Sequence, residues 1–156
     1  MKNPYLRRNS SLVTSIPVET SPLDAYLQFL DKICHQAKVF SLYKDGWSVS
    51  ATESGTYALS IWQSESLARV MQQGKWAEFE VREIAFLEFI EQTLPFLRKQ
   101  RMVLMLDLNL EGKYISADAI KLLSDLKKYL YLLSRKEPHL FFERILPLPR
   151  LVRIHH

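Results

Sequence analysis

The hydrophobic positions change their period several times along the chain, and each change predicts a new element. From Leu23 to Ala37 apolar side chains recur at helical spacing, and Ser21 followed by Pro22 is a typical helix start. Apolar runs or two-residue alternation then predict three strands, at residues 39–43, 47–52 and 57–61. The Asp45-Gly46 pair between the first two is a strong turn signal. These segments predict a helix followed by a β-meander.

The second half of the chain alternates single strands with helices. Ser64 is the expected cap of a second helix that ends at Gly74, and Phe79 to Val81 has the alternation of a short strand. From Glu83 the period is helical again, with Pro95 inside it, which predicts a kink or an early end.

The C-terminal part begins with a continuous apolar run from Met102 to Leu108, the pattern of a strand buried on both faces. Ser116 is then the expected N-cap of a long last helix that runs to about Ser134. The predicted fold class is α+β: a mostly antiparallel sheet, a β-meander plus one or two further strands, with helices packed on it and a long C-terminal helix.

Three short motifs add a family to this fold prediction. They are Asp45-Gly46-Trp47, the segment 58–62 with Ser64 after it, and Gly74-Lys75-Trp76-Ala77. This succession resembles a bacterial family, domain of unknown function 2750, with its GW, LPLW-S and G-W-A spacing. The resemblance covers roughly residues 24–110. Ala58 and Ser60 stand where the family tends to have Leu and Pro. More distantly, the order of elements is similar to the N-terminal domain of the enhanced-serine-sensitivity protein family. Neither resemblance implies a catalytic residue.

Charge divides the chain into three parts. Residues 1–18 carry three basic and no acidic side chains, and residues 135–156 carry five basic and two acidic ones. The part between holds 13 basic and 15 acidic side chains, so the basic pI of about 9.2 arises at the two ends. We expect a flexible N-terminal segment (1–20), one domain (21–134), and a basic, apolar, proline-containing C-terminal extension (135–156). A mildly acidic domain makes a nucleic-acid partner unlikely as a first choice.

Several classes of protein are disfavoured by what the sequence lacks. There is a single cysteine, Cys34, and no apolar run long enough for a membrane span or a signal peptide. We therefore expect a cytoplasmic protein. The histidines and the cysteine lack metal-ligand spacing, and no glycine-rich phosphate loop or nucleophile elbow is present. The expectation is a non-enzymatic protein without a metal or other cofactor.

The last predicted helix carries more apolar residues than one face requires. One stripe is expected to face the core: Ile120, Leu123, Leu126, Leu130 and Leu133. A second stripe, Leu122, Tyr129 and Leu132, is displaced around the helix. Either residues 138–149 fold back over this second stripe or a second chain covers it, as a partner or as the other half of a homodimer.

The tryptophans and the acidic residues allow a structural and a functional interpretation. Gly46, Trp47, Trp62, Gly74 and Trp76 are interpreted as the structural signature of the fold, with an aromatic cage or stacking platform as the alternative. Glu78 and Glu80 are expected on an outward face.

Two functional hypotheses follow from these features. The first is a protein-interaction module that binds through Leu122, Tyr129, Leu132, Glu78 and Glu80, for instance an immunity protein that neutralises a bacterial toxin. The second is an accessory nucleic-acid or membrane-surface protein that acts through its basic termini, where Arg144, Arg150 and Arg153 alternate with apolar residues.

Overall fold

The structure, a computed structural model, describes residues 21–142 and 146–154. The N-terminal segment that was predicted to be flexible lies outside these residues, as do Arg144 and the terminal pair His155-His156. The α-helices are α1 (Pro22–Gln36), α2 (Glu65–Val70), α3 (Phe86–Glu88), α4 (Leu94–Lys99) and α5 (Ala119–Lys136). The strands are β2 (Lys38–Tyr43), β3 (Val49–Ala51), β4 (Tyr57–Ile61), β5 (Glu80–Ala85), β6 (Val103–Leu106) and β7 (Ile115–Ala117). A π-helical segment, η2 (Phe89–Thr93), joins α3 to α4, and short 3₁₀ turns are η1 (Gly74–Trp76), η3 (Pro138–Phe141) and η4 (Pro149–Leu151).

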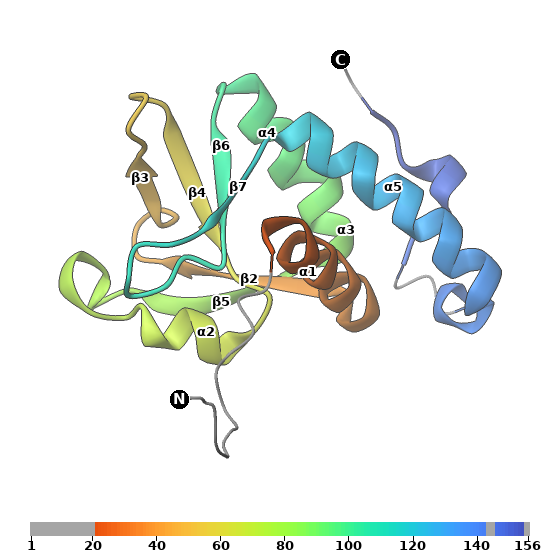
Figure 1. The fold of residues 1–156 in the computed structure, drawn as a ribbon, viewed down its shortest axis with the longest axis horizontal. Coiled ribbons are helices and arrows are strands. Elements are labelled where there is room, and N and C mark those ends of the chain that lie inside the picture. Colours follow the sequence, from red (N-terminus) through yellow and green to blue (C-terminus); the bar gives the residue numbers. More distant parts are fainter. Residues whose placement is uncertain (1–20, 143–145, 155–156) are drawn as a thin grey trace, which may run out of the picture.

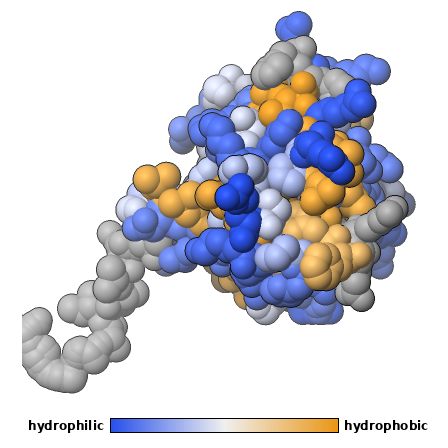
Figure 2. Space-filling view, turned by 90° about the vertical axis from the view of Figure 1, so that its right-hand side faces the viewer, coloured by the Kyte–Doolittle hydropathy of each residue, from blue (hydrophilic) through white to orange (hydrophobic). Residues whose placement is uncertain are grey.

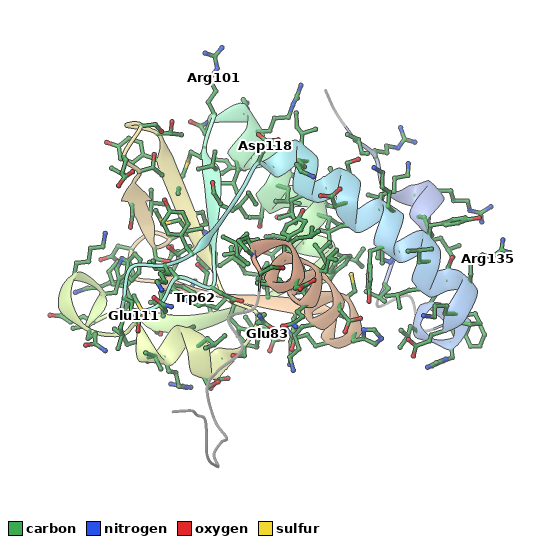
Figure 3. All side chains as sticks on the ribbon, in the orientation of Figure 1. Trp62, Glu83, Arg101, Glu111, Asp118 and Arg135 are labelled. Atoms are coloured by element: carbon green, nitrogen blue, oxygen red, sulfur yellow. The ribbon has the colours of Figure 1, made fainter. Side chains whose placement is uncertain are left out.

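The strands form two small sheets that meet at one point (Figure 1). One sheet has the order β3-β4-β6-β7, in which β4 and β6 run parallel and the other pairs antiparallel; the other sheet is the antiparallel pair β2-β5. Phe40 and Trp62 join the sheets through two backbone hydrogen bonds of 2.9 and 2.8 Å. Trp62 thus lies at the junction (Figure 3). The helices and the predominantly antiparallel pairing confirm the predicted α+β class.

The predicted β-meander is only partly present. β3 and β4 form the expected hairpin, but β2 forms its ladder with β5, from Lys38 opposite Ala85 to Tyr43 opposite Glu80. A single bridge between Tyr43 and Trp47 is all that pairs β2 with the start of the next strand. The turn between them places Asp45, not Gly46, in the left-handed region, with φ of 56°. The turn therefore carries the chain from one sheet into the other instead of closing a simple hairpin.

Two of the three predicted helix caps are confirmed. The Ser21 hydroxyl accepts a hydrogen bond from the Asp24 amide (3.1 Å), and the Ser64 hydroxyl accepts one from the Leu67 amide (3.2 Å). Ser116 was wrong as the cap of the last helix, because it lies in β7 opposite Met105. Asp118 caps α5 instead, and Figure 3 shows it at the start of that helix. Its carboxylate accepts from the amides of residues 120 and 121 at 3.1 and 3.0 Å.

The helical run after β5 starts later than predicted and contains an irregular turn. Glu83 and Ala85 pair with Phe40 and Lys38, so the ladder overrides the helical pattern until Phe86. A proline lacks the amide hydrogen of a regular helix, and its ring clashes with the carbonyl four residues earlier. The π-helical turn directly before α4 widens the helix at this position, so the run passes through Pro95 without ending.

The apolar side chains are buried in two clusters. The larger cluster lies between α1, α3, α4, α5 and the sheets, and the smaller one packs Trp62 and Trp76 under α2. Phe141, Leu146 and Val152 belong to the larger cluster, so the described part of the C-terminal extension packs on the same core.

Candidate functional site

A groove of about 520 Å³ lies between α1 and α5 and extends to β7. Its walls are mainly apolar. Its lining residues include Leu23, Tyr26, Leu27, Lys121, Asp125, Lys128, Tyr129 and Leu132. Leu23, Leu27 and Leu132 are 65%, 47% and 55% exposed. Three leucines that line one groove and remain accessible form a continuous apolar surface, which is the kind of surface that marks an interaction site.

Helical spacing explains why α1 contributes leucines both to the core and to the groove. Leu23, Leu27 and Leu30 lie four and then three residues apart, so they form one row along the helix. Leu30 is buried beneath the groove, and the row reaches the surface towards the N-terminal end of α1. One row of side chains therefore anchors α1 and supplies a wall of the groove.

The first pair of polar groups in the groove is Tyr26 and Asp125. The Tyr26 hydroxyl donates a 2.7 Å hydrogen bond to the Asp125 carboxylate, which also accepts from the Lys121 ammonium at 3.0 Å. Burial, together with this bond to Asp125, raises the pKa of Tyr26. Burial opposes ionisation of Asp125, but its bonds from Tyr26 and Lys121 outweigh that effect and hold its pKa below its ordinary value. The pair thus joins a neutral phenol on α1 to an ionised carboxylate on α5.

The second polar pair lies nearer the C-terminal ends of the two helices. The Tyr129 hydroxyl on α5 donates to the Asp31 carboxylate on α1, and burial and this bond both raise the pKa of Tyr129. Beside it, the His35 ring contacts the Glu137 carboxylate at 2.9 Å through Nε2 and the Asp31 backbone oxygen at 2.9 Å through Nδ1. The bond to Glu137 is the main reason that the pKa of His35 is raised.

These contacts determine what the groove can offer a partner. The hydroxyls of Tyr26 and Tyr129 both donate to carboxylates across the interface between the two helices. The groove therefore presents mostly hydrocarbon.

The structure separates the residues of the second apolar stripe. Leu122 is fully buried in the core, so it contributes nothing to the surface. Tyr129 is half-buried and bonded to Asp31, and only Leu132 is well exposed. Tyr129 and Leu132 line the groove beside α1, whereas Leu122 belongs to the larger core cluster, which also contains the buried residues of the C-terminal extension. Tyr129 and Leu132 thus lie together in the groove, and Leu122 does not line it.

The two glutamates proposed as partner residues do not line the groove. Glu78 lies before β5 and forms an ion pair with Lys44, which lowers the pKa of Glu78 and raises that of Lys44. Glu80 starts β5 and forms an ion pair with Arg82 at 2.9 Å. The structure therefore does not bring these carboxylates together with Leu132.

The signature residues have two kinds of environment. Trp62 and Trp76 are buried with their ring centroids 6.0 Å apart, edge to face, and the Trp62 indole donates a 2.8 Å bond to the Leu108 carbonyl. Gly74 has a φ of 59°, which a glycine adopts without strain. Trp47, after Gly46, is only half-buried and lines a second hollow on the surface.

The sequence did not identify Leu23 and Leu27 as surface residues, because their spacing is that of a core-facing row. Their position in the first half of α1, before its buried residues begin at Phe29, distinguishes them from Leu30. In residues 21–142 and 146–154, no group of three or more His, Cys, Asp or Glu side chains could hold a metal ion. No helix in the described part of the chain is both long and apolar enough to cross a membrane.

The fold and the groove define a small α+β domain with an apolar groove between its first and last helices. The chain belongs to the family described as Protein of unknown function (DUF2750), which matches residues 26–126. The match contains Tyr26 and Asp125, whereas Tyr129 and Leu132 lie beyond it. No curated protein and no solved structure matches the chain. The more distant similarity to the enhanced-serine-sensitivity family stays a prediction.

Proposed function

We propose that this protein is a binding module that accepts an amphipathic helix of another protein in the groove between α1 and α5. The observation that carries the proposal is the internal pairing of the tyrosines and carboxylates in the groove, which leaves Leu23, Leu27 and Leu132 as its accessible surface. A surface of this kind gains free energy by burying apolar area, about 1.5–3 kcal/mol for each leucine that becomes fully covered.

The shape and charge of the groove specify the partner further. Two helices form its walls, and an apolar groove between helices accepts the apolar face of a third helix. Lys128 lies on the rim and is exposed, and it forms no ion pair with another residue in the described part of the chain. We therefore expect leucine-like anchors on the partner helix, with an acidic residue beside them that faces Lys128.

A toxin bound by an immunity protein is one case of such a complex. The acidic residues first expected to face a toxin, Glu78 and Glu80, lie in ion pairs outside the groove. The proposal therefore rests on the apolar groove and is made for the general class of protein-binding modules.

Site-specific photocrosslinking tests the proposal. Benzoylphenylalanine is placed at position 132 in the groove or, as the control, at position 111 in the exposed loop before β7. We expect a protein adduct at 132 and none at 111, with loss of the adduct in a Leu27→Asp background. The captured protein, once purified, should bind at least about tenfold more weakly to Leu27→Asp than to the unmodified chain.

Two results would overturn the proposal. If light scattering shows a dimer of the purified chain, and Leu27→Asp dissociates it without unfolding, the groove is an interface between copies. If the crosslink at 132 forms within one chain to residues 1–20, and deleting those residues abolishes it, the chain's own N-terminal segment occupies the groove.

A second candidate function, binding to an anionic membrane surface, is favoured by the C-terminal extension. Phe142 and Leu151 are large apolar residues exposed there, and Arg150 and Arg153 line the same surface hollow. Figure 2, which views the molecule from the right-hand side of Figure 1, shows hydrophobic residues in several patches among hydrophilic ones. Exposed aromatic and aliphatic side chains beside arginines are typical of proteins that lie on a membrane surface.

Vesicle co-sedimentation distinguishes this second candidate. Vesicles with about one third phosphatidylglycerol should retain the protein, vesicles of phosphatidylcholine alone should not, and Leu151→Asp with Arg150→Glu should abolish retention. Equal partitioning of the variant and the unmodified chain would exclude this surface.

A further inference from the structure

A second hollow, of about 680 Å³, lies between the β3–β4 hairpin and the helical run formed by α3, η2 and α4. Its lining residues include Trp47, Tyr57, Glu88, Gln92, Thr93 and Phe96. All of them lie within the stretch that the family match covers. The volume falls in the range of about 300–1,000 Å³ that is usual for small-molecule sites.

Three aromatic rings face this hollow from three separate elements. Trp47 precedes β3, Tyr57 begins β4, and Phe96 lies on α4; Tyr57 and Phe96 are 60% and 55% exposed. Alternation along the hairpin places Trp47 and Val49 on the same face as Tyr57, which pairs with Ala51. Aromatic residues that only fill a core are buried, whereas these rings remain accessible in one concave surface. Such an arrangement favours a ligand that can pack on the ring faces.

The Trp47 ring packs against the ring of Tyr43, which helps to fix its position. Its ring meets the Tyr43 ring edge to face at a centroid distance of 4.9 Å, and the Arg82 guanidinium lies 3.8 Å from the centroid of Tyr43. Arg82 also forms an ion pair with Glu80, with 2.9 Å between Nη2 of Arg82 and Oε1 of Glu80. Trp47 is therefore held in place before any ligand arrives, which lowers the entropic cost of binding.

The polar side chains of the hollow are open to a ligand. Thr93 and Gln92 belong to the π-helical turn that precedes Pro95, so the extra residue of this turn determines where they project. Across the described ranges, the side chains of Glu88, Gln92 and Thr93 form no hydrogen bond or ion pair with one another or with other residues. Among the described lining residues, Glu88 is the one with a formal charge at neutral pH.

We propose that this hollow binds an arylalkylamine, a planar aromatic ring that bears a protonated amino group on a short alkyl chain. The ring would pack on Trp47, Tyr57 and Phe96, and the ammonium group would lie near the Glu88 carboxylate and the electron-rich faces of the aromatic rings. Gln92 and Thr93 supply both hydrogen-bond donors and acceptors for further polar groups on the ligand. A flat cationic ligand uses the aromatic faces, the single negative charge and the free polar groups together, whereas an aliphatic or anionic ligand uses only part of them. This inference does not depend on the groove between α1 and α5.

Titration with tryptamine, followed by ¹H–¹⁵N correlation NMR, tests the inference. The indole N–H signal of Trp47, assigned by its disappearance in Trp47→Phe, should shift in a saturable way at millimolar or lower tryptamine. The signals of Trp62 and Trp76, which are buried in the other cluster, should stay in place. Two matched compounds serve as controls: 2-cyclohexylethylamine lacks the aromatic ring, and indole-3-acetate replaces the positive charge with a negative one.

Variants locate the charge that recognises the amine. Glu88→Gln should weaken tryptamine binding at least about fivefold, because it removes the carboxylate and keeps the size of the side chain. Glu91→Gln is the matched control, since Glu91 lies on the same helical run but lines the hollow of the C-terminal extension. Absence of a saturable shift, equal binding of all three compounds, or unchanged affinity in Glu88→Gln would each overturn the proposal.

Discussion

The groove between α1 and α5 and the hollow beside the β3–β4 hairpin are similar in size and both mainly apolar, yet their polar groups differ. In the groove the hydroxyls of Tyr26 and Tyr129 donate to carboxylates across the helix interface. In the hollow, Tyr57 and Glu88 form no side-chain hydrogen bond or ion pair within the described part of the chain. The first surface therefore offers hydrocarbon to a partner, and the second offers free polar groups and aromatic faces to a ligand.

The difference follows from how far apart in sequence the walls are. Tyr26 and Asp125 are 99 residues apart, so the groove exists only if specific contacts hold α1 against α5. The hollow is lined by residues between positions 47 and 102, and one of its walls is held by strand pairing, since β3 pairs with β4 and β4 with β6. Backbone pairing positions this wall, so the side chains of the hairpin that face the hollow are free for other roles.

The largest expected effect separates a core residue of α5 from an exposed residue of the same helix that lines the groove. Leu122→Ala, deep in the core, should lower the free energy of unfolding by about 2–5 kcal/mol through lost burial and a new cavity. Leu132→Ala, on the same helix but exposed, should change it by no more than about 0.5 kcal/mol. Urea denaturation of the two variants measures both values. Similar losses at the two positions would show that Leu132 is covered in solution.

The next effect concerns the hydroxyl groups. Tyr26→Phe removes the donor to Asp125 and leaves a half-buried carboxylate with one bond fewer, so the free energy of unfolding should fall by about 1–2 kcal/mol. Tyr57→Phe removes a hydroxyl from the hollow, where it has no partner among the described residues, and should change stability by less than about 0.5 kcal/mol. The midpoints of urea denaturation of the two variants measure this difference, provided that the free energy of unfolding depends on the urea concentration with the same slope in both. Equal losses would mean that Tyr57 is bonded as firmly as Tyr26.

Local signals in the sequence were sufficient for most elements of the fold. Serine caps at residues 21 and 64, the β3–β4 hairpin and the apolar strand β6 depend on neighbouring residues, and the structure has them where the pattern placed them. The wrong predictions concern residues whose secondary structure is determined by pairing with a residue distant in the sequence. Glu83 has helical neighbours but pairs with Phe40, and Ser116 is suited to a cap but pairs with Met105.

The candidate site was harder to predict than the fold for the same reason. Helical periodicity identified Tyr129 and Leu132 as lying off the core-facing stripe, but it placed Leu122 with them although Leu122 is fully buried in the core. The position of Trp47 on a surface hollow depends on α4 approaching the hairpin from another part of the chain. A large aromatic residue at a strand end is typical of a core, and only the three-dimensional arrangement shows that this one remains half-buried.

A smaller effect should appear in the pH dependence of the contact between α1 and α5. The Glu137 bond raises the folded-state pKa of His35 above its ordinary value of 6.5, so the protonated ring stabilises the folded chain. This contribution is fully present below about pH 6.5 and is lost as the pH rises through the folded-state pKa. Because His35 is partly exposed, the loss should be under about 1 kcal/mol.

The control for this pH effect is His35→Gln. The difference in free energy of unfolding between the unmodified chain and His35→Gln should shrink as the pH rises from about 6 to about 8.5. Asp31 and Glu137, which face the ring, and the neighbouring Tyr129 remain in both proteins, so the difference isolates the imidazole. A difference that stays constant with pH would mean that the His35–Glu137 contact does not form in solution.

The smallest expected effect is in the hollow, where a charge can be removed with almost no change in stability. Glu88 is exposed and forms no ion pair within the described ranges, so Glu88→Gln removes no attractive contact and leaves no buried group unsatisfied. The free energy of unfolding should therefore change by no more than about 0.5 kcal/mol. Thermal and urea denaturation of Glu88→Gln beside Glu91→Gln measure the change. A loss above about 1 kcal/mol in Glu88→Gln alone would show that its carboxylate already holds the fold together as Asp125 does, and the contrast between the two surfaces would then disappear.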